Sequence, residues 1–134
     1  IKEKNLEKKV LTLGYIKDEE LPTIYKLARF LIFPSFDEGF GIPIVEAFSM
    51  GTPVITSNLS SMSEIAGDSA LLVDPNSVLE ISNAILNMHL NPVLRTTFSQ
   101  KGLSRSRLFD WKITAERTVN EIKKIIERRY IPDN

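Results

Sequence analysis

Two glutamates, Glu38 and Glu46, flank a glycine-rich segment near the first third of the chain. Between them, Gly39 and Gly41 surround an aromatic residue, Phe40, and allow positive φ angles or close approach of a ligand to the backbone. The segment leads into an apolar stretch that is expected to be helical. The free N–H groups and the positive dipole end of a helix suit a phosphate group, so this pattern predicts an anion seat built from backbone.

No basic residue accompanies the anion seat in the sequence. All 17 lysines and arginines lie outside residues 30–94, whereas acids occur throughout that range. A carboxylate beside a diphosphate is unfavourable unless it accepts hydrogen bonds from hydroxyl groups. Two flanking carboxylates therefore favour a ligand with hydroxyl-rich groups on both sides of a phosphate linkage. A nucleotide sugar has this layout, with a ribose, a diphosphate and a hexose.

Alternating strands and helices are predicted to position this segment. Apolar runs predict strands at residues 10–15, 30–33, 53–56 and 70–73, and helical spacing predicts helices at about 18–28, 42–50, 61–66 and 78–88, after 92, and at 111–130. The loop at 34–41 holds too many breakers for either element. The alternation predicts one α/β domain over residues 1–134, a Rossmann-like parallel sheet with helices on both faces. Ligands of such sheets bind at the carboxyl ends of the strands, where this loop lies.

The composition excludes several classes of protein. The 17 basic and 17 acidic residues give no net field that would attract nucleic acid. Without cysteine, and with one histidine, the chain cannot form disulfides, thiolate sites or multi-histidine metal sites, and a reducing compartment, the cytoplasm, is expected. No apolar run approaches the length of a membrane span. The start at Ile1, with neither a methionine nor a signal peptide, suggests a piece of a larger protein.

Similarity to a known family begins at the same residues. It runs through Pro34-Ser35, Glu38-Gly39-Phe40-Gly41, Pro43, Glu46 and Gly51-Thr52-Pro53-Val54-Ile55, and continues through Glu64, Gly67, Asp74-Pro75, Gly102 and residues 109–111. This set resembles the C-terminal, donor-binding half of GT-B fold, family 4 (group 1) retaining glycosyltransferases. The two glutamates with seven residues between them are that family's signature, and the similarity covers nearly all of the chain.

The resemblance implies a role for each matching position. Glu38 would be the catalytic residue that holds hydroxyls of the donor sugar close to the reacting carbon, and Glu46 would bind the ribose hydroxyls. The remaining donor-binding residues implied are Gly39, Phe40, Gly41, Ile42 and Ile44, with Tyr15 and Ile16 near the base. The reaction would transfer a glycosyl group from a nucleotide donor to an acceptor hydroxyl with retained configuration, with no cofactor and no metal.

Partners and alternatives also follow from the resemblance. The acceptor-binding domain and the basic residues that help hold the diphosphate would lie upstream of this chain, so the isolated chain is expected to be inactive, and peripheral attachment of the full-length protein to a membrane stays open. A glycoside hydrolase with paired carboxylates and a non-catalytic sugar-nucleotide-binding or interaction module are the alternatives. Phe40 could simply pack its loop. Trp111 is expected to anchor the last helix in the core.

Overall fold

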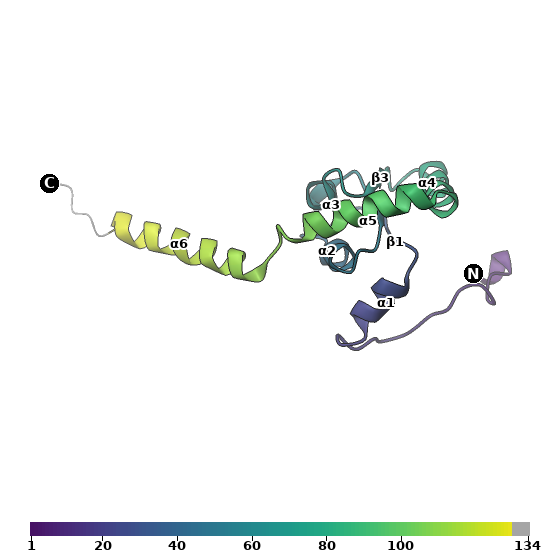
Figure 1. Ribbon diagram of the computed structural model, residues 1–134, viewed down its shortest axis with the longest axis horizontal. Coiled ribbons are helices and arrows are strands. Elements are labelled where there is room, and N and C mark those ends of the chain that lie inside the picture. Colours follow the sequence, from purple (N-terminus) through teal and green to yellow (C-terminus); the bar gives the residue numbers. More distant parts are fainter. Residues whose placement is uncertain (130–134) are drawn as a thin grey trace.

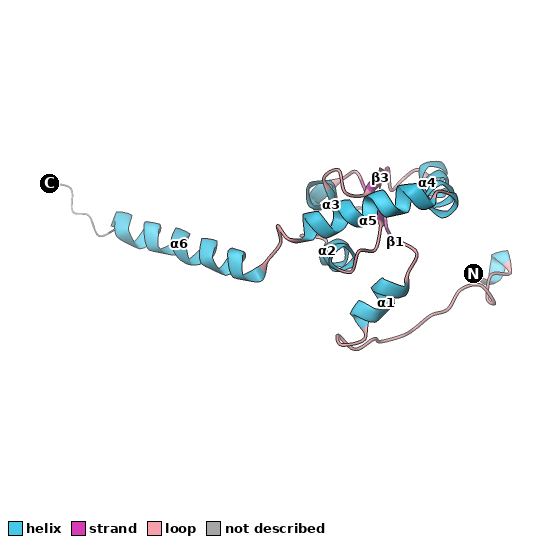
Figure 2. Ribbon diagram, in the orientation of Figure 1, coloured by secondary structure: helices cyan, strands magenta, loops and turns pink. Residues whose placement is uncertain are grey.

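The computed structural model describes residues 1–129, in which helices alternate with three short strands (Figures 1 and 2). The elements are a 3₁₀ turn η1 (Lys2–Lys4), the helices α1 (Leu21–Leu27), α2 (Ile42–Ser49), α3 (Ser60–Ala66), α4 (Val78–Leu90), α5 (Pro92–Ser106) and α6 (Trp111–Arg129), and the strands β1 (Leu31–Phe33), β2 (Val54–Ser57) and β3 (Leu71–Val73). Residue 130, at the end of the predicted last helix, lies outside the described residues.

The strands form one parallel sheet in the order β1-β2-β3. Leu31 lies opposite Val54, and Ile55 lies opposite Leu71. Parallel neighbours need crossover connections, and α2 and α3 provide them. The predicted α/β class is confirmed, and each of these strands begins and ends within one residue of its predicted position.

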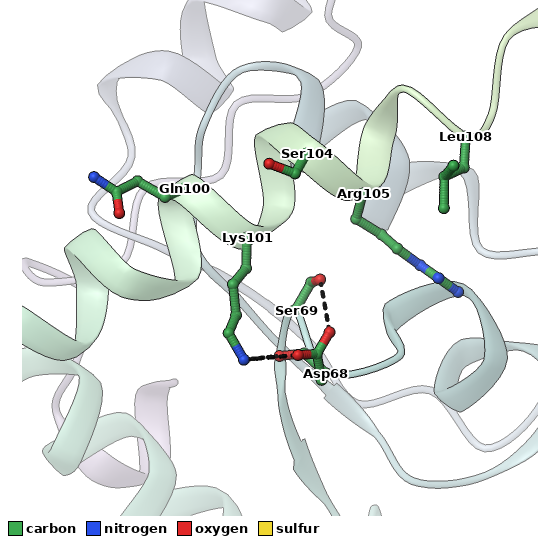
Figure 3. Close-up of a pocket in the computed structure, with 7 residues that line it drawn as sticks. All are labelled: Asp68, Ser69, Gln100, Lys101, Ser104, Arg105 and Leu108. Atoms are coloured by element: carbon green, nitrogen blue, oxygen red, sulfur yellow. Dashed lines mark hydrogen bonds and ion pairs between the residues drawn. The ribbon is translucent and has the colours of Figure 1, made fainter.

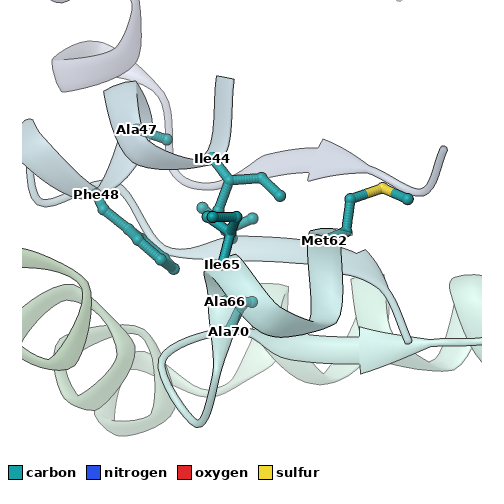
Figure 4. Close-up of a cluster of buried hydrophobic side chains, with 8 residues drawn as sticks. Ile44, Ala47, Phe48, Met62, Ile65, Ala66 and Ala70 are labelled. Carbon is teal, nitrogen blue, oxygen red and sulfur yellow. The ribbon is translucent and has the colours of Figure 1, made fainter. Parts of the chain in front are cut away.

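Helices cover both faces of this sheet, as predicted. Adjacent side chains of β2 point in opposite directions: Val54 joins a buried cluster with α2 and α3, whereas Ile55 joins a second buried cluster with α4. Figure 4 shows the first cluster, in which side chains from α2 meet side chains from α3. The labelled members are Ile44, Ala47, Phe48, Met62, Ile65, Ala66 and Ala70.

Helix α5 packs closely against α2 because one position carries no side chain. Gly102 is buried, and a Cβ atom there would lie 2.7 Å from Cδ1 of Phe48. Atoms at that distance overlap, so a larger residue would force the two helices apart. The glycine thus sets the distance between the helices that hold Phe48 in the core.

The strand predicted at residues 10–15 is not present. This segment is extended and exposed, with Leu11 at 81% and Tyr15 at 89% exposure, and it runs away from the sheet between η1 and α1 (Figure 1). A strand forms only where a neighbouring strand accepts its backbone hydrogen bonds. An apolar run predicts the strand but not that neighbour, and no described strand pairs with this segment.

The expectation that Trp111 anchors the core is also wrong. Helix α6 projects away from the body of the molecule (Figure 1), and Trp111 is 81% exposed. Every side chain from residue 111 to residue 128 is exposed. Asp110 begins the helix by accepting a hydrogen bond from the Lys112 N–H at 2.8 Å. The helix therefore forms with its apolar stripe uncovered by any described residue.

Candidate functional site

The start of α2 lies at the carboxyl end of β1 and depends on Gly41. This residue precedes the helix with a φ of +98°, and a Cβ atom there would lie 3.2 Å from Cδ1 of Ile44. Both the backbone angle and the close approach favour glycine. Pro43 occupies the first turn, where its missing N–H costs little, as the sequence predicted.

The anion seat predicted from the sequence corresponds to a run of backbone N–H groups without acceptors. Within residues 1–129, the N–H groups of Gly39, Phe40, Gly41 and Ile42 donate to no other residue. The next available N–H, that of Ile44, donates to the Gly41 carbonyl at 3.0 Å. Unpaired N–H groups at a helix start bind anions well, so residues 39–42 can hold a phosphate by backbone alone.

Glu38 lies in front of the anion seat and is partly buried. Its Oε1 accepts a hydrogen bond from the Ser35 hydroxyl at 3.0 Å, and its carbonyl accepts one from the Ser61 hydroxyl at 2.7 Å. The Ser57 hydroxyl donates to the Ser35 carbonyl. The loop is thus tied to the carboxyl end of β2 and to α3, and the second oxygen of Glu38 has no protein donor among the described residues.

The serine side chains that hold this loop were not predicted from the sequence. Ser57 ends strand β2, and Ser60 and Ser61 begin α3, so all three lie at the edge where ligands of a parallel sheet bind. This position at or just after the end of an apolar strand was the sequence signal that could have identified them. Their hydroxyls contact backbone and carboxylate groups of residues 35–38, so they support the site by fixing its shape.

Glu46 lies behind the anion seat and contacts α1. Its Oε2 accepts a hydrogen bond from the Tyr25 hydroxyl at 3.0 Å. Burial, this hydrogen bond and the adjacent negative charge all raise the pKa of the Tyr25 phenol. The phenol therefore stays protonated and remains a donor. The sequence did not single out Tyr25 as a residue of the candidate site.

A small cavity adjoins this pair between α1 and α2. It has a volume of about 130 Å³, and its polar lining consists of Asp18, Tyr25, Glu46 and Ser49. Ser49 donates its hydroxyl to the Glu46 carbonyl at 2.7 Å. None of the described residues that line the cavity is a cation, so it is suited to neutral groups that donate hydrogen bonds rather than to phosphate.

Phe40 both packs its loop and remains accessible. Its ring meets Phe109 edge to face, with centroids 5.8 Å apart and planes at 88°, yet 45% of Phe40 is exposed. The Arg105 guanidinium lies over the Phe109 ring, 5.5 Å from its centroid. It also donates hydrogen bonds to the carbonyls of Glu64 and Ile65. The loop is thereby braced from α5 and α3.

Three of the predicted donor-binding residues contribute no accessible group to the anion seat at residues 39–42 or to the cavity beside Glu46. Ile44 is 0% exposed within the core, and its N–H is already paired, so it supports α2 from beneath and presents no free group to a ligand. Tyr15 is 89% exposed, and neither it nor Ile16 lines the cavity beside Glu46. Tyr15 ends the segment that was wrongly predicted as a strand, and Ile16 follows it. Ile42, in contrast, is 52% exposed at the seat.

A larger, open groove of about 400 Å³ lies on α5, away from both glutamates (Figure 3). Lys101 reaches across it to the Asp68 carboxylate at 2.7 Å. This hydrogen bond and charge lower the pKa of Asp68. Since Lys101 and Arg105 are both engaged with protein oxygens, the groove offers no free cation to a ligand.

Two kinds of feature are absent from residues 1–129. No three histidine, aspartate or glutamate side chains converge there as a metal ion would require. No helix within the same range combines the length and apolar character needed to cross a bilayer.

Comparisons with known proteins agree on one family. The family model for glycosyl transferases group 1 matches residues 1–105. The O-antigen chain mannosyltransferase B of Escherichia coli is 43% identical over 111 residues, which are 83% of this chain and 29% of that protein. The MMP alpha-(1->4)-mannosyltransferase of Mycolicibacterium hassiacum is 32% identical over 123 residues, which are 89% of this chain and 30% of that protein.

A solved structure supports the same assignment. The sucrose-phosphate synthase of Thermosynechococcus elongatus superimposes with a TM-score of 0.88 at 29% identity, covering 95% of this chain and 33% of that one. The chain thus spans about a third or less of the length of the proteins it matches. The family match covers most of the sequence. The chain therefore belongs to the group 1 glycosyl transferases, and its Rossmann-like sheet is part of a GT-B fold.

Proposed function

We propose that this chain is the donor-binding half of a retaining glycosyltransferase, which transfers a hexosyl group from a nucleoside-diphosphate sugar to an acceptor hydroxyl. The observation that carries the proposal is the row of unpaired N–H groups at residues 39–42, with a partly buried carboxylate on either side. Backbone donors suit a diphosphate, and carboxylates suit the hydroxyls of the groups that it joins.

The seat would act on the leaving group. Transfer breaks the bond between the anomeric carbon and the diphosphate oxygen, forms a bond from that carbon to the acceptor oxygen and releases the acceptor's proton. Negative charge grows on the diphosphate, and the N–H groups of Phe40, Gly41 and Ile42 would stabilise it there. Glu38 would hold hydroxyls of the sugar through the oxygen that Ser35 leaves free. No metal is assigned a role in this proposal.

The relatives support the choice of a sugar donor and a second domain. Two of the proteins described above are named as mannosyltransferases, which favours a hexosyl donor. This chain spans 29–33% of its relatives' lengths, so the acceptor site is assigned to the remaining part of the full-length protein. We expect the 134-residue chain alone to show no turnover.

The test is transfer by the full-length protein with Glu38 replaced by Gln. Gln keeps the size of the side chain but removes its charge, and we expect the transfer rate to fall by about 10²–10³-fold, as when one stabilising group is removed from an active site. The matched control is Glu116→Gln on α6, which is exposed and distant from the seat, and should transfer at the wild-type rate. Wild-type transfer by the Glu38 variant would contradict the catalytic role.

A further inference from the structure

The hydrogen bond between Tyr25 and Glu46 joins two elements that are not adjacent in the sequence. Tyr25 belongs to α1 and Glu46 to α2, with β1 and the loop at 34–41 between them. The phenol oxygen lies 3.0 Å from Oε2 of Glu46. A hydrogen bond that fixes a charged carboxylate is among the stronger ones in proteins.

The backbone and the ring of Tyr25 are also held in place. Its carbonyl accepts a hydrogen bond from the Thr52 hydroxyl at 2.7 Å, and Thr52 is 2% exposed. The ring packs against the buried cluster of α2 and α3. Since both its backbone and its ring are anchored, the hydroxyl has a fixed position from which to orient Glu46.

We propose that Tyr25 is a positioning residue for Glu46: its hydroxyl holds Oε2, so that Oε1 accepts hydrogen bonds from the ribose of the donor. This role rests on the proposed function, in which Glu46 binds that ribose. The geometry supports it because the same two side chains line the cavity of about 130 Å³, and among the described lining residues there is no cation that could hold Glu46 instead.

The experiment compares a ribose with a ribose that lacks its hydroxyls. The full-length protein is titrated calorimetrically with uridine, guanosine and adenosine diphosphate, and the tightest-binding one is then compared with its 2′,3′-dideoxy form. In the wild type, we expect the dideoxy form to bind about tenfold more weakly, the value of one hydrogen bond to a charged group. In Tyr25→Phe, which keeps the ring, this ratio should fall to about two.

Three further variants separate positioning from general stability. Glu46→Gln should lower the same ratio, and Tyr25→Phe added to Glu46→Gln should change it no further, because the two residues act through one contact. Ser82→Ala removes a hydroxyl from the exposed surface of α4 and should keep the wild-type ratio. A partly unfolded variant binds both nucleotides less well by the same factor, so the ratio stays informative even if Tyr25→Phe is destabilised.

The outcomes distinguish this proposal from the proposed function. A wild type that binds none of the three nucleoside diphosphates would overturn the proposed function and the role of Tyr25 with it. A wild type that discriminates the dideoxy form, together with a Tyr25→Phe variant that discriminates it equally, would overturn the positioning role alone.

Discussion

The packed body, residues 31–109, and helix α6 carry similar amphipathic patterns but differ in what covers them. In α2, the side chains of Ile44 and Phe48 are 0% exposed against α3 and α5. In α6, Ile122 and Ile126 lie on one stripe, yet they are 51% and 55% exposed. The pattern thus specifies which face of a helix is apolar, but stability comes only where another described element packs against that face.

The largest effect is expected at Phe48. Phe48→Ala removes the largest fully buried side chain, so the free energy of unfolding of the chain should fall by about 3–5 kcal/mol in urea denaturation. The matched control is Phe36→Ala, because Phe36 is 64% exposed and should change this free energy by less than about 0.5 kcal/mol. Equal losses in the two variants would contradict the description of the body as packed.

A smaller effect is expected where α5 meets α2. Gly102→Ala would gain about 1 kcal/mol of helix propensity, but its Cβ atom would overlap Phe48, and overpacking costs about 1–3 kcal/mol. We expect a net loss of up to about 2 kcal/mol in the same measurement. Ser104→Ala on the exposed side of α5 is the control and should stay within about 0.5 kcal/mol. A stabilised Gly102 variant would show that the two helices can separate at no cost.

The smallest effect is expected in α6. Ile122→Ser should change the unfolding free energy of the 134-residue chain by less than about 0.5 kcal/mol, because no described residue buries Ile122. Ile65→Ser in α3 is the matched substitution at a residue 4% exposed, and it should cost at least about 2 kcal/mol. A comparable loss at Ile122 would mean that the stripe of α6 is covered in solution.

Local sequence patterns were sufficient to predict the three strands of the sheet, the loop at 34–41 and the start of α2. Apolar runs bounded by glycine and proline locate buried strands because a strand covered on both faces must be apolar throughout. Gly41 and Pro43 likewise predict a helix start, since each residue is tolerated there for a local backbone reason. These features depend on neighbours close in the sequence. The eight-residue separation of Glu38 and Glu46 can likewise be read directly from the sequence.

Features that need a partner distant in the sequence could not be predicted from local patterns. The run at 10–15 resembles a strand, but no described strand pairs with it. Trp111 resembles a core residue, but it is 81% exposed among the described residues. The contact between Tyr25 and Glu46 spans 21 residues, and no local pattern predicts it. Pairing and burial are properties of two surfaces in contact, and one segment's sequence describes only one of those surfaces.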